Sequence, residues 1–494
     1  MTPDTIVLLV PLVPLVGAIL IGLSHRHPNI REAVTLITAV LLFSLLVSLL
    51  PEVLSGARPA VVLATPLPGL SIALELEPLG LLFALTASFL WIVTSIYSIG
   101  YMRGHHDRHQ TRFYTYFAIS LASTMGVAFA ANMLTLFVFY EVLTLSTYPL
   151  VTHLGTQGAR RAGRVYLGFL LGTSIGLQLL AIIWTWLLAG TLDFTLGGVL
   201  EGKASPPVIG LLFVLYVLGI GKAALMPFHR WLPAAMVAPT PVSALLHAVA
   251  VVKVGVFTIL KVSVYLFGLD VLSNLGTRQW LMYLAGVTIL VGSLVALRQD
   301  NLKARLAYST ISQLSYVILG ALLANTWGVV GSGMHITMHA FGKITLFFCA
   351  GAIAVATHKT EVSQMDGLGK TMPITMIAFL IGSLSVIGLP PMGGMWSKWY
   401  LALGTLEAGQ VLLLAILLLS ALLNVAYLLP IPVRAFFKDP PQPEASTVMK
   451  EAPLPCVIAL VITSLGCLLL FVWPEPIYEL LCMVLPTCPG LEAR

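Results

Sequence analysis

Long, unbroken runs of apolar residues fill most of the chain, and polar positions gather in short stretches between them. Strands that cross a bilayer alternate apolar and polar residues, so continuous runs favour helices. A helix needs about 20 apolar residues to cross the hydrocarbon core. The pattern therefore predicts fourteen membrane helices, over residues 4–24, 31–51, 77–101, 112–130, 132–153, 163–189, 207–236, 241–267, 277–297, 302–323, 326–357, 372–402, 409–433 and 453–474.

The composition supports an all-α integral membrane protein. Of 494 residues, 58% are hydrophobic and 9% are charged, whereas soluble domains carry about 25% charged residues. No stretch has the composition of a separate soluble domain, and the longest polar loops are expected near 52–76 and 435–452. The first apolar run lacks a basic leader and a small-residue cleavage site, so we expect it to be retained as a helix.

The basic residues predict the orientation. Placing the N-terminus outside puts most of the 26 lysines and arginines into inner loops, where basic residues concentrate in membrane proteins. An even number of helices then leaves both termini on the outer side. The same distribution accounts for most of the net charge of +6, so no nucleic-acid partner is implied.

Known cofactor motifs are missing from the sequence. It has no dinucleotide fingerprint, no phosphate loop and no haem motif, and its five cysteines lack metal-ligand spacing, so we expect no cofactor and no metal. Cys482 and Cys488 could form a disulfide on the outer face, but two buried or reduced thiols are favoured. The histidines of residues 105–109 are interpreted as part of a solvated loop.

Charged residues inside the apolar runs are the strongest functional signal. A charge at mid-bilayer costs about 2.5–3.5 kcal/mol on insertion scales, and such residues usually mark an ion or proton path. Five residues meet this description: Glu141, Lys222, Lys253, Lys343 and Lys398. Because four of the five are lysines, they cannot pair with one another, and a role in conduction is favoured over structural ion pairing.

His335, His339 and Lys343 are spaced i, i+4, i+8, which places them in one stripe along a helix. Two imidazoles in register suit proton transfer, because each ring can accept a proton on one nitrogen and donate from the other. Lys343 either lines this path or anchors its helix by bonding backbone at a break.

A looser series comprises Ser243, His247 and Lys253. The first two are one helical turn apart, whereas Lys253 lies about 120° away from an ideal continuation. Water or a neighbouring helix would have to bridge that step.

The only carboxylate deep in the apolar runs is that of Glu141, which makes it the natural partner of Lys222. Burial lowers the pKa of an ammonium group and a nearby carboxylate raises it again. We therefore predict a Glu141–Lys222 ion pair whose strength controls whether the lysine holds or passes its proton.

Prolines interrupt two of the predicted helices, each beside a lysine. Pro227 follows Lys222, and Pro390–Pro391 precedes Lys398. Proline removes a backbone donor, and in lipid such a break requires protein or water to satisfy the freed groups. Broken helices seven and twelve are five apart in the series, which predicts two inverted five-helix repeats, helices 4–8 and 9–13.

Four segments resemble a known family. Residues 221–261, "GKAALMPFHRWLPAAMVAPTPVSALLHAVAVVKVGVFTILK", look like the central signature of the antiporter-like subunits shared by respiratory complex I and Mrp-type multisubunit cation/proton antiporters. "DNLKARLAYSTISQLSYVILG" (300–320), "MHAFGKITLFFCAGAI" (338–353) and "GLPPMGGMWSKWYL" (388–401) are similar to three further family segments. The resemblance spans roughly residues 75–435.

The resemblance implies fourteen transmembrane helices, inverted repeats and a central hydrophilic axis. The implied residues of this axis are Glu141, Lys222, Lys253, His335 or His339, and Lys398. The expected division is three N-terminal helices (1–110), a first repeat (111–268), a second repeat (269–435), and a loop, helix and tail (436–494).

Within this family the chain most resembles the D subunit of Mrp antiporters, through "HAFGKITLFFCAGAI" followed by "THKTEVSQMDGLGK". Two differences separate it from other branches: no long C-terminal extension follows the last apolar run, and residue 398 is lysine where one complex I branch has glutamate.

These patterns together predict a proton-translocating subunit of a multisubunit Na⁺/H⁺ antiporter, without enzymatic chemistry of its own. It would lie with other membrane subunits in a cytoplasmic (inner) membrane of bacterial or archaeal type. Protons would enter near Glu141–Lys222, pass Lys253 and the two histidines, and leave near Lys398. The alternative is the proton-pumping subunit of a redox complex such as complex I or a hydrogenase. A self-sufficient transporter for an organic solute is a weaker third interpretation.

Overall fold

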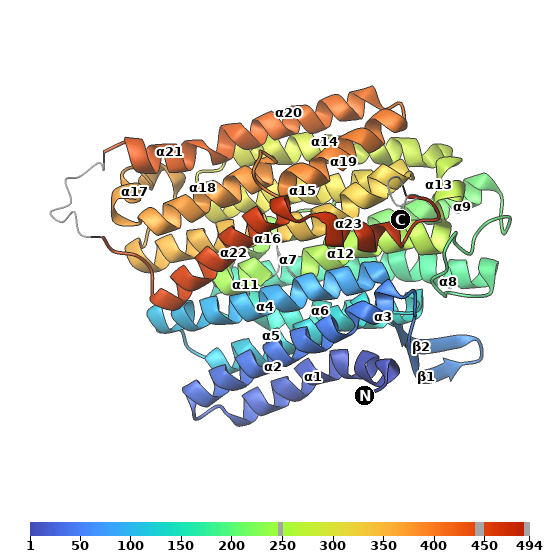
Figure 1. Cartoon of the computed structure of the whole chain (residues 1–494), viewed down its shortest axis with the longest axis horizontal. Helices are drawn as coiled ribbons and strands as arrows, with labels where there is room; N and C mark the ends of the chain where they lie inside the picture. The colour runs from blue at the N-terminus through green and yellow to red at the C-terminus, as the bar shows by residue number, and fades with distance from the viewer. Residues whose placement is uncertain (246–249, 440–448, 489–494) are drawn as a thin grey trace.

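The computed structural model describes residues 1–245, 250–439 and 449–488. Its helices lie side by side and run mostly along the long axis of the molecule (Figure 1). Within the described residues, ten helices are long and apolar enough to cross a membrane. The predicted all-α membrane fold is confirmed. The number of fourteen crossings, the inverted repeats and the four-part division remain predictions.

The N-terminal part of the chain contains six helices and one hairpin: α1 (Pro3–Leu23), α2 (Pro28–Ser48), α3 (Leu50–Leu54), β1 (Ala60–Leu67), β2 (Leu70–Glu75), α4 (Pro78–Gly104), α5 (Gln110–Ala128) and α6 (Met133–Val151). The middle part is more interrupted: α7 (Gln157–Thr173), the π-turn η1 (Ser174–Gln178), α8 (Leu179–Ala189), α9 (Pro206–Gly219), η2 (Gly221–Ala223), α10 (Trp231–Ala234), η3 (Ala235–Val237), α11 (Thr240–Ala244), α12 (Val251–Lys261), η5 (Val262–Phe267) and α13 (Leu269–Ser273).

The remaining elements are α14 (Gly276–Arg298), α15 (Leu302–Leu323), α16 (Thr326–Thr357), η6 (Val362–Gln364), α17 (Leu368–Thr371), α18 (Pro373–Ile387), α19 (Gly394–Glu407), α20 (Val411–Leu428), α21 (Pro430–Phe437), α22 (Leu454–Val472) and α23 (Glu475–Cys482). The longest of them, α16, packs against α4, α15, α18, α19 and α22. It is buried almost throughout, so its side chains lie in the interior of the bundle.

Local sequence explains where several helices begin. Asn132 caps α6 by accepting a hydrogen bond from the Thr135 backbone N–H at 2.8 Å, and Asn325 caps α16 through the Gly328 N–H at 2.8 Å. An Asn side chain satisfies one of the unpaired donors of the first turn. These two caps fix the ends of helices that carry candidate functional residues.

Residues 52–76, expected to form a polar loop, contain the antiparallel hairpin β1–β2. Strand β2 is held at the base of α6, where the Ala73 N–H donates to Thr135 Oγ1 at 2.9 Å. The stretch is rich in Val, Leu, Ile and Ala, and β-branched residues favour strands. The hairpin projects beside the N-terminal end of α1 (Figure 1).

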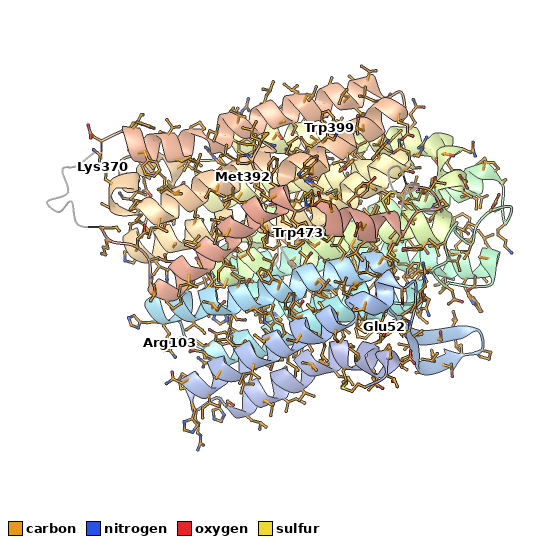
Figure 2. All side chains as sticks on the ribbon, in the orientation of Figure 1. Glu52, Arg103, Lys370, Met392, Trp399 and Trp473 are labelled. Carbon is orange, nitrogen blue, oxygen red and sulfur yellow. A yellow bond between two sulfur atoms is a disulfide. The ribbon has the colours of Figure 1, made fainter. Side chains whose placement is uncertain are left out.

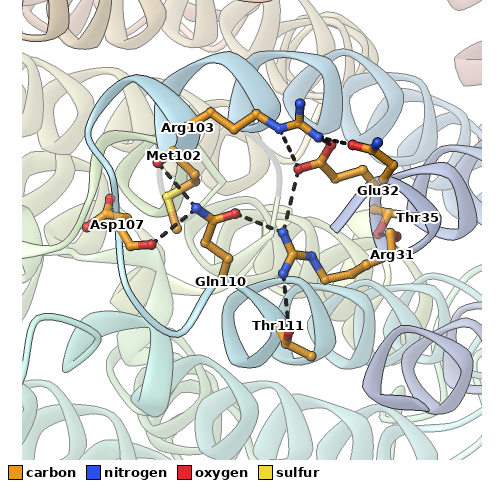
Figure 3. A network of polar contacts seen from close by, with 9 residues as sticks. Arg31, Glu32, Thr35, Met102, Arg103, Asp107, Gln110 and Thr111 are labelled. Carbon is orange, nitrogen blue, oxygen red and sulfur yellow. Dashed lines mark hydrogen bonds and ion pairs between the residues drawn. The ribbon is translucent and has the colours of Figure 1, made fainter. Parts of the chain in front are cut away.

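A polar network joins the N-terminal helices to the rest of the bundle (Figure 3). The Arg103 guanidinium donates to both carboxylate oxygens of Glu32, at 3.1 and 2.5 Å. Arg31 donates to Gln110 Oε1 at 2.8 Å and to Thr111 Oγ1 at 3.2 Å. The network therefore ties α2 to α4 and α5. Arg103 and Lys370 lie at one end of the bundle and Glu52 at the other (Figure 2).

Both predicted breaks are present. Helix α9 ends at Gly219, and a short 3₁₀ turn with Ala224 at φ +55° follows before Pro227. Helix α18 ends at Ile387, and α19 begins only at Gly394, beyond the Pro390–Pro391 pair. The π-turn η1 within residues 163–189 was not predicted; it lies inside a helix that is continuous over Gln157–Ala189.

Cys482 and Cys488 are joined by a disulfide, so the favoured interpretation of two free thiols is wrong. The intervening chain turns back after α23, which brings their Cα atoms to 5.4 Å, inside the range that a disulfide spans. Cys349, Cys456 and Cys467 are free and buried.

Candidate functional site

Lys222 lies in the turn that interrupts the seventh predicted helix. Its side chain is fully buried, and its ammonium group donates to the Tyr140 carbonyl at 2.8 Å and to Thr144 Oγ1 at 2.5 Å, both on α6. Trp231 holds the turn closed by donating from Nε1 to the Gly221 carbonyl at 3.0 Å. The break thus allows a lysine to face the neighbouring helix α6.

The predicted Glu141–Lys222 ion pair is wrong for this structure. Both carboxylate oxygens of Glu141 are buried and have no hydrogen-bond partner among the described residues. Tyr140 and Thr144 are one turn apart and share the face of α6 toward Lys222. Glu141 is rotated about 100° from Tyr140 around the helix, so its carboxylate does not bond the ammonium, although it lies near enough to act on Lys222 electrostatically.

Lys253 and the histidine stripe meet in the centre of the bundle. Lys253 Nζ lies 2.8 Å from His339 Nδ1, which joins α12 to α16. The His339 and His335 rings stack with centroids 5.5 Å apart, and His335 Nδ1 lies 2.8 Å from Ser397 Oγ on α19. The structure therefore brings together three predicted site residues from two helices.

Each histidine has one ring nitrogen left over. The Nε2 atoms of His335 and His339 are buried and have no hydrogen-bond partner in the part of the chain that the structure describes, while each Nδ1 is engaged. Buried polar atoms are nearly always hydrogen-bonded in proteins, to protein or to water. Two unpartnered nitrogens on stacked rings therefore mark a place where a water or a proton can be held.

The side chain of Lys398 bonds backbone groups at the second break. Its ammonium donates to the carbonyls of Val386 and Ile387, each at 2.9 Å, which are among the last carbonyls of α18 and lack partners within the helix. The same ammonium lies 4.9 Å from the centre of the Tyr316 ring, which stacks on His335 at 5.6 Å. Lys398 is thereby linked to the histidine stripe through one aromatic ring.

The partners of Lys343 come from α15, and no helix break lies at this lysine. It donates to Ser309 Oγ at 2.6 Å and more weakly to the Leu306 carbonyl at 3.4 Å, both on α15. Since α16 is continuous through Lys343, the interpretation that it anchors a helix at a break is wrong. The Ser309 hydroxyl also forms a hydrogen bond with the Tyr427 hydroxyl, at 2.7 Å.

The looser series of the eighth predicted helix stays a prediction. Ser243 is buried, and its hydroxyl donates to the carbonyls of Ala238 and Pro239, at 3.4 and 3.5 Å. His247 lies outside the described residues.

Sequence reasoning missed the neutral partners of these amines: Thr144, Ser309, Tyr316, Ser397 and the freed carbonyls. Hydroxyl groups in membrane helices commonly bond the carbonyl one turn earlier, and Thr144 does so as well, to Tyr140 at 3.1 Å. Their sequence positions therefore carry no distinct signal. Only the packing of α6, α15 and α19 against the lysines identifies them.

Helices long enough to cross a membrane, two proline-linked breaks and a buried series of amines and imidazoles define a multi-pass membrane protein with an ionisable interior. Residues 130–424 match the family described as the transmembrane region of NADH:quinone oxidoreductase and Mrp antiporters, and residues 68–114 match the N-terminus of complex I chain 5. The chain belongs to this family of antiporter-like membrane subunits.

Individual relatives come from several complexes. The chain is 34% identical over 394 residues to NADH-quinone oxidoreductase subunit N of Desulforudis audaxviator, covering 78% of this chain and 77% of that one. It is 35% identical over 342 residues to NAD(P)H-quinone oxidoreductase chain 5 of Synechocystis, where it covers 64% of this chain and 48% of the relative. It thus spans about half the length of that relative.

Two solved structures share the fold. A chain of the Mrp complex from Dietzia superposes with a TM-score of 0.87 at 21% identity, covering 98% of this chain and 97% of that one. A chain of an archaeal membrane-bound sulfane sulfur reductase superposes with a TM-score of 0.85 at 23% identity, covering 97% and 96%. The family resemblance is confirmed.

Proposed function

We propose that the chain is the proton-translocating subunit of a multisubunit Na⁺/H⁺ antiporter. The observation that carries this proposal is the 2.8 Å contact between Lys253 Nζ and His339 Nδ1, both buried. Two cations cannot share a hydrogen bond, so one of the two nitrogens must be an acceptor. The pair is therefore a proton donor beside a proton acceptor, which is the arrangement that proton transfer requires.

The remaining steps follow the same residues. From His339 a proton would reach the stacked ring of His335 through a bridging water, since the Nε2 atoms of both rings are buried without a partner among the described residues. Lys398 lies beyond the Tyr316 ring. Lys222 would act at the other end of the path, where its ammonium group donates to the hydroxyl of Thr144. The carboxylate of Glu141, which has no hydrogen-bond partner among the described residues, would accept a proton at that end.

This path requires partners. An antiporter exchanges Na⁺ for H⁺, and the complexes whose chains share this fold are multisubunit assemblies. We propose that other membrane subunits pack on the apolar outer faces of this chain. We also propose that both termini lie on the outer side of a cytoplasmic membrane. The chain itself would transport and not catalyse.

The second candidate is the proton-pumping subunit of a redox complex. It is favoured by the relatives that carry the names of quinone oxidoreductase subunits. The same interior path would then be driven by electron transfer in partner subunits. Neighbouring genes separate the two: small antiporter subunits support the first, and subunits for iron–sulfur clusters and quinone support the second.

The test uses the intact complex reconstituted into vesicles, with proton movement followed by a pH-sensitive dye. Lys253→Met removes the proton carrier but keeps the length of the side chain, and we expect at least a tenfold loss of proton flux. Lys203→Ala changes an exposed lysine and should leave the flux at the wild-type value. An assembled Lys253→Met complex with full flux would overturn the proposal.

A further inference from the structure

An apolar groove with a volume of about 360 Å³ runs along the outer surface of α7. Its lining extends from Val165 to Leu177 on α7 and η1, and it includes Phe228 from the chain that follows η2. Gly168 and Gly172 are exposed in the groove, and a Cβ atom at either position would have nothing within 4 Å. The groove therefore exists because side chains are missing from this face of the helix. We call it the α7 groove.

The length of the α7 groove matches one leaflet of a bilayer. At 1.5 Å per residue, the helix from Val165 to Leu177 covers about 18 Å, and half of a hydrocarbon core of about 30 Å is about 15 Å. Beyond Leu177 the surface of α8 carries the exposed, bulky side chains of Leu180, Ile183 and Leu187. A transmembrane helix of a partner would need a groove along the whole thickness, whereas an acyl chain needs only one leaflet.

Two arginines continue the face of the groove toward the first turns of α7. Arg161 is seven residues before Gly168 and Arg164 is four residues before it, so both lie near the same side of the helix. Both side chains are exposed. The two stretches of chain that form the groove belong to segments without any Asp or Glu, residues 142–192 and 202–269. The end of the groove is therefore positively charged, while its length is apolar.

This charged end lies at the same end of the bundle as Arg103 (Figure 2). Arg103 is in the last turn of α4, shortly before α5 begins. Arg112, in the first turn of α5, donates to the His153 carbonyl at 2.9 Å, and α7 begins shortly after His153. The distribution of basic residues predicts that this end is the inner one, where anionic lipids give the membrane surface a negative potential.

The topology of the chain alone accounts for arginines at this end, because basic residues concentrate in inner loops. It does not account for an open apolar groove that begins directly beside two of them. An anionic phospholipid has both complementary parts, since its phosphate accepts hydrogen bonds from guanidinium groups and its acyl chain fills an apolar groove of one leaflet.

The wall of the groove adjoins the break that carries Lys222. Phe228 comes from the chain after η2, and Thr173, which also lines the groove, packs so closely on Gly221 that no Cβ atom would fit there. A chain break at membrane depth must be covered by protein or lie along a water-filled cavity. A lipid in the groove would cover Phe228 and Thr173 with apolar atoms.

We propose that the α7 groove binds one anionic phospholipid, with an acyl chain along Gly168 and Gly172 and the phosphate on Arg161 and Arg164. This inference adds a lipid site on the outer surface of the subunit. It does not depend on which ion the subunit transports or on what drives the transport.

The test uses the intact complex in phosphatidylcholine vesicles that contain phosphatidylglycerol with a photoreactive group on one acyl chain. After illumination, the labelled peptides are identified by mass spectrometry. We expect the label on residues 165–177 or on Phe228. A phosphatidylcholine probe with the same photoreactive chain, at the same fraction of the lipid, should label these residues at least tenfold less.

Two kinds of variant separate the charge from the groove. An arginine near the membrane surface strengthens the binding of an anionic lipid about fivefold, so Arg161→Gln together with Arg164→Gln should lower labelling at least tenfold. Arg26→Gln removes an exposed arginine between α1 and α2 and should label like the wild type. Gly168→Leu keeps both arginines but fills the groove, and it should also lower labelling at least tenfold.

Three results would overturn the proposal. Equal labelling by the two probes, or wild-type labelling in the double arginine variant, would show that any lipid of the bilayer fills the groove. Wild-type labelling in Gly168→Leu would show that the arginines attract lipid without a bound acyl chain. No labelling of the intact complex would show that a partner subunit covers α7. Proton flux in Lys253→Met, which tests the proposed function, is independent of all three.

Discussion

The backbone contact between α12 and the turn that carries Lys222 leads to a quantitative prediction. Gly255 packs against this turn so closely that a Cβ atom in its place would lie 2.3 Å from the Ala223 nitrogen and 2.4 Å from the Lys222 carbonyl carbon. Neither is the end of a side chain that could rotate away. Ordinary contact begins near 3.4 Å, so Gly255→Ala must push the two segments about 1 Å apart.

That displacement is large on the scale of the lysine's hydrogen bonds. The Lys222 ammonium lies 2.8 Å from the Tyr140 carbonyl and 2.5 Å from Thr144 Oγ1, and a shift of about 1 Å takes such contacts beyond hydrogen-bond length. Misplacing a reacting group by 1 Å can cost about 10²-fold in rate. We expect Gly255→Ala to lower proton flux tenfold to a hundredfold, and overpacking to destabilise the fold by about 1–3 kcal/mol.

The assay is dye-monitored proton flux in vesicles, normalised to assembled complex on a native gel. Gly22→Ala in α1 is the matched control, because nothing lies within 4 Å of a Cβ at that position, and it should leave flux unchanged. An assembled Gly255→Ala complex with wild-type flux would refute the reasoning, since the position of Lys222 would then not matter to transport.

Two further predictions concern single side chains. Thr144→Val removes the hydroxyl that accepts from Lys222 and should lower proton flux at least tenfold. Thr144→Ser keeps the hydroxyl and should retain the wild-type flux. Equal flux in the two variants would contradict the role of this contact. Burial, with repulsion from Arg112, lowers the pKa of His153 from 6.5 to about 4. Between these two pH values only the unfolded chain takes up a proton at this histidine. The free energy of unfolding should therefore fall by up to about 3 kcal/mol as the pH drops from 6.5 to 4. Thermal melts of the purified complex should show that slope, and a His153→Phe variant with the same slope would exclude His153 as its source.

The sequence predicts the parts of the fold that depend on local composition. Apolar runs determine which segments can be membrane helices, and proline chemistry determines where two of them stop, so the breaks near Pro227 and Pro390 were expected. The i, i+4 spacing of His335 and His339 likewise predicted that their rings would lie together, and they stack at 5.5 Å.

Features that depend on how helices rotate and pack were not predictable in the same way. Glu141 and Tyr140 are adjacent in the chain, and only the packing of α6 decides which of them faces Lys222. The disulfide of Cys482 depends on a turn after α23, and the partner of Lys343, Ser309, comes from a helix more than 30 residues away in the chain. None of these contacts leaves a periodic pattern in the sequence.

Two groups of cations in the described residues have different partners. Toward the ends of the helices, the buried Lys261 pairs with the Glu77 carboxylate at 3.2 Å, and the half-exposed Arg103 pairs with the buried Glu32 carboxylate. In the interior, Lys222 and Lys398 are held by carbonyls and a hydroxyl. A fixed carboxylate keeps a neighbouring amine protonated, because it raises the pKa of that amine. If the amine lost its proton, the buried carboxylate would be left as an unpaired charge. Neutral acceptors impose no such penalty, which fits the role in a proton path that we propose for the interior amines.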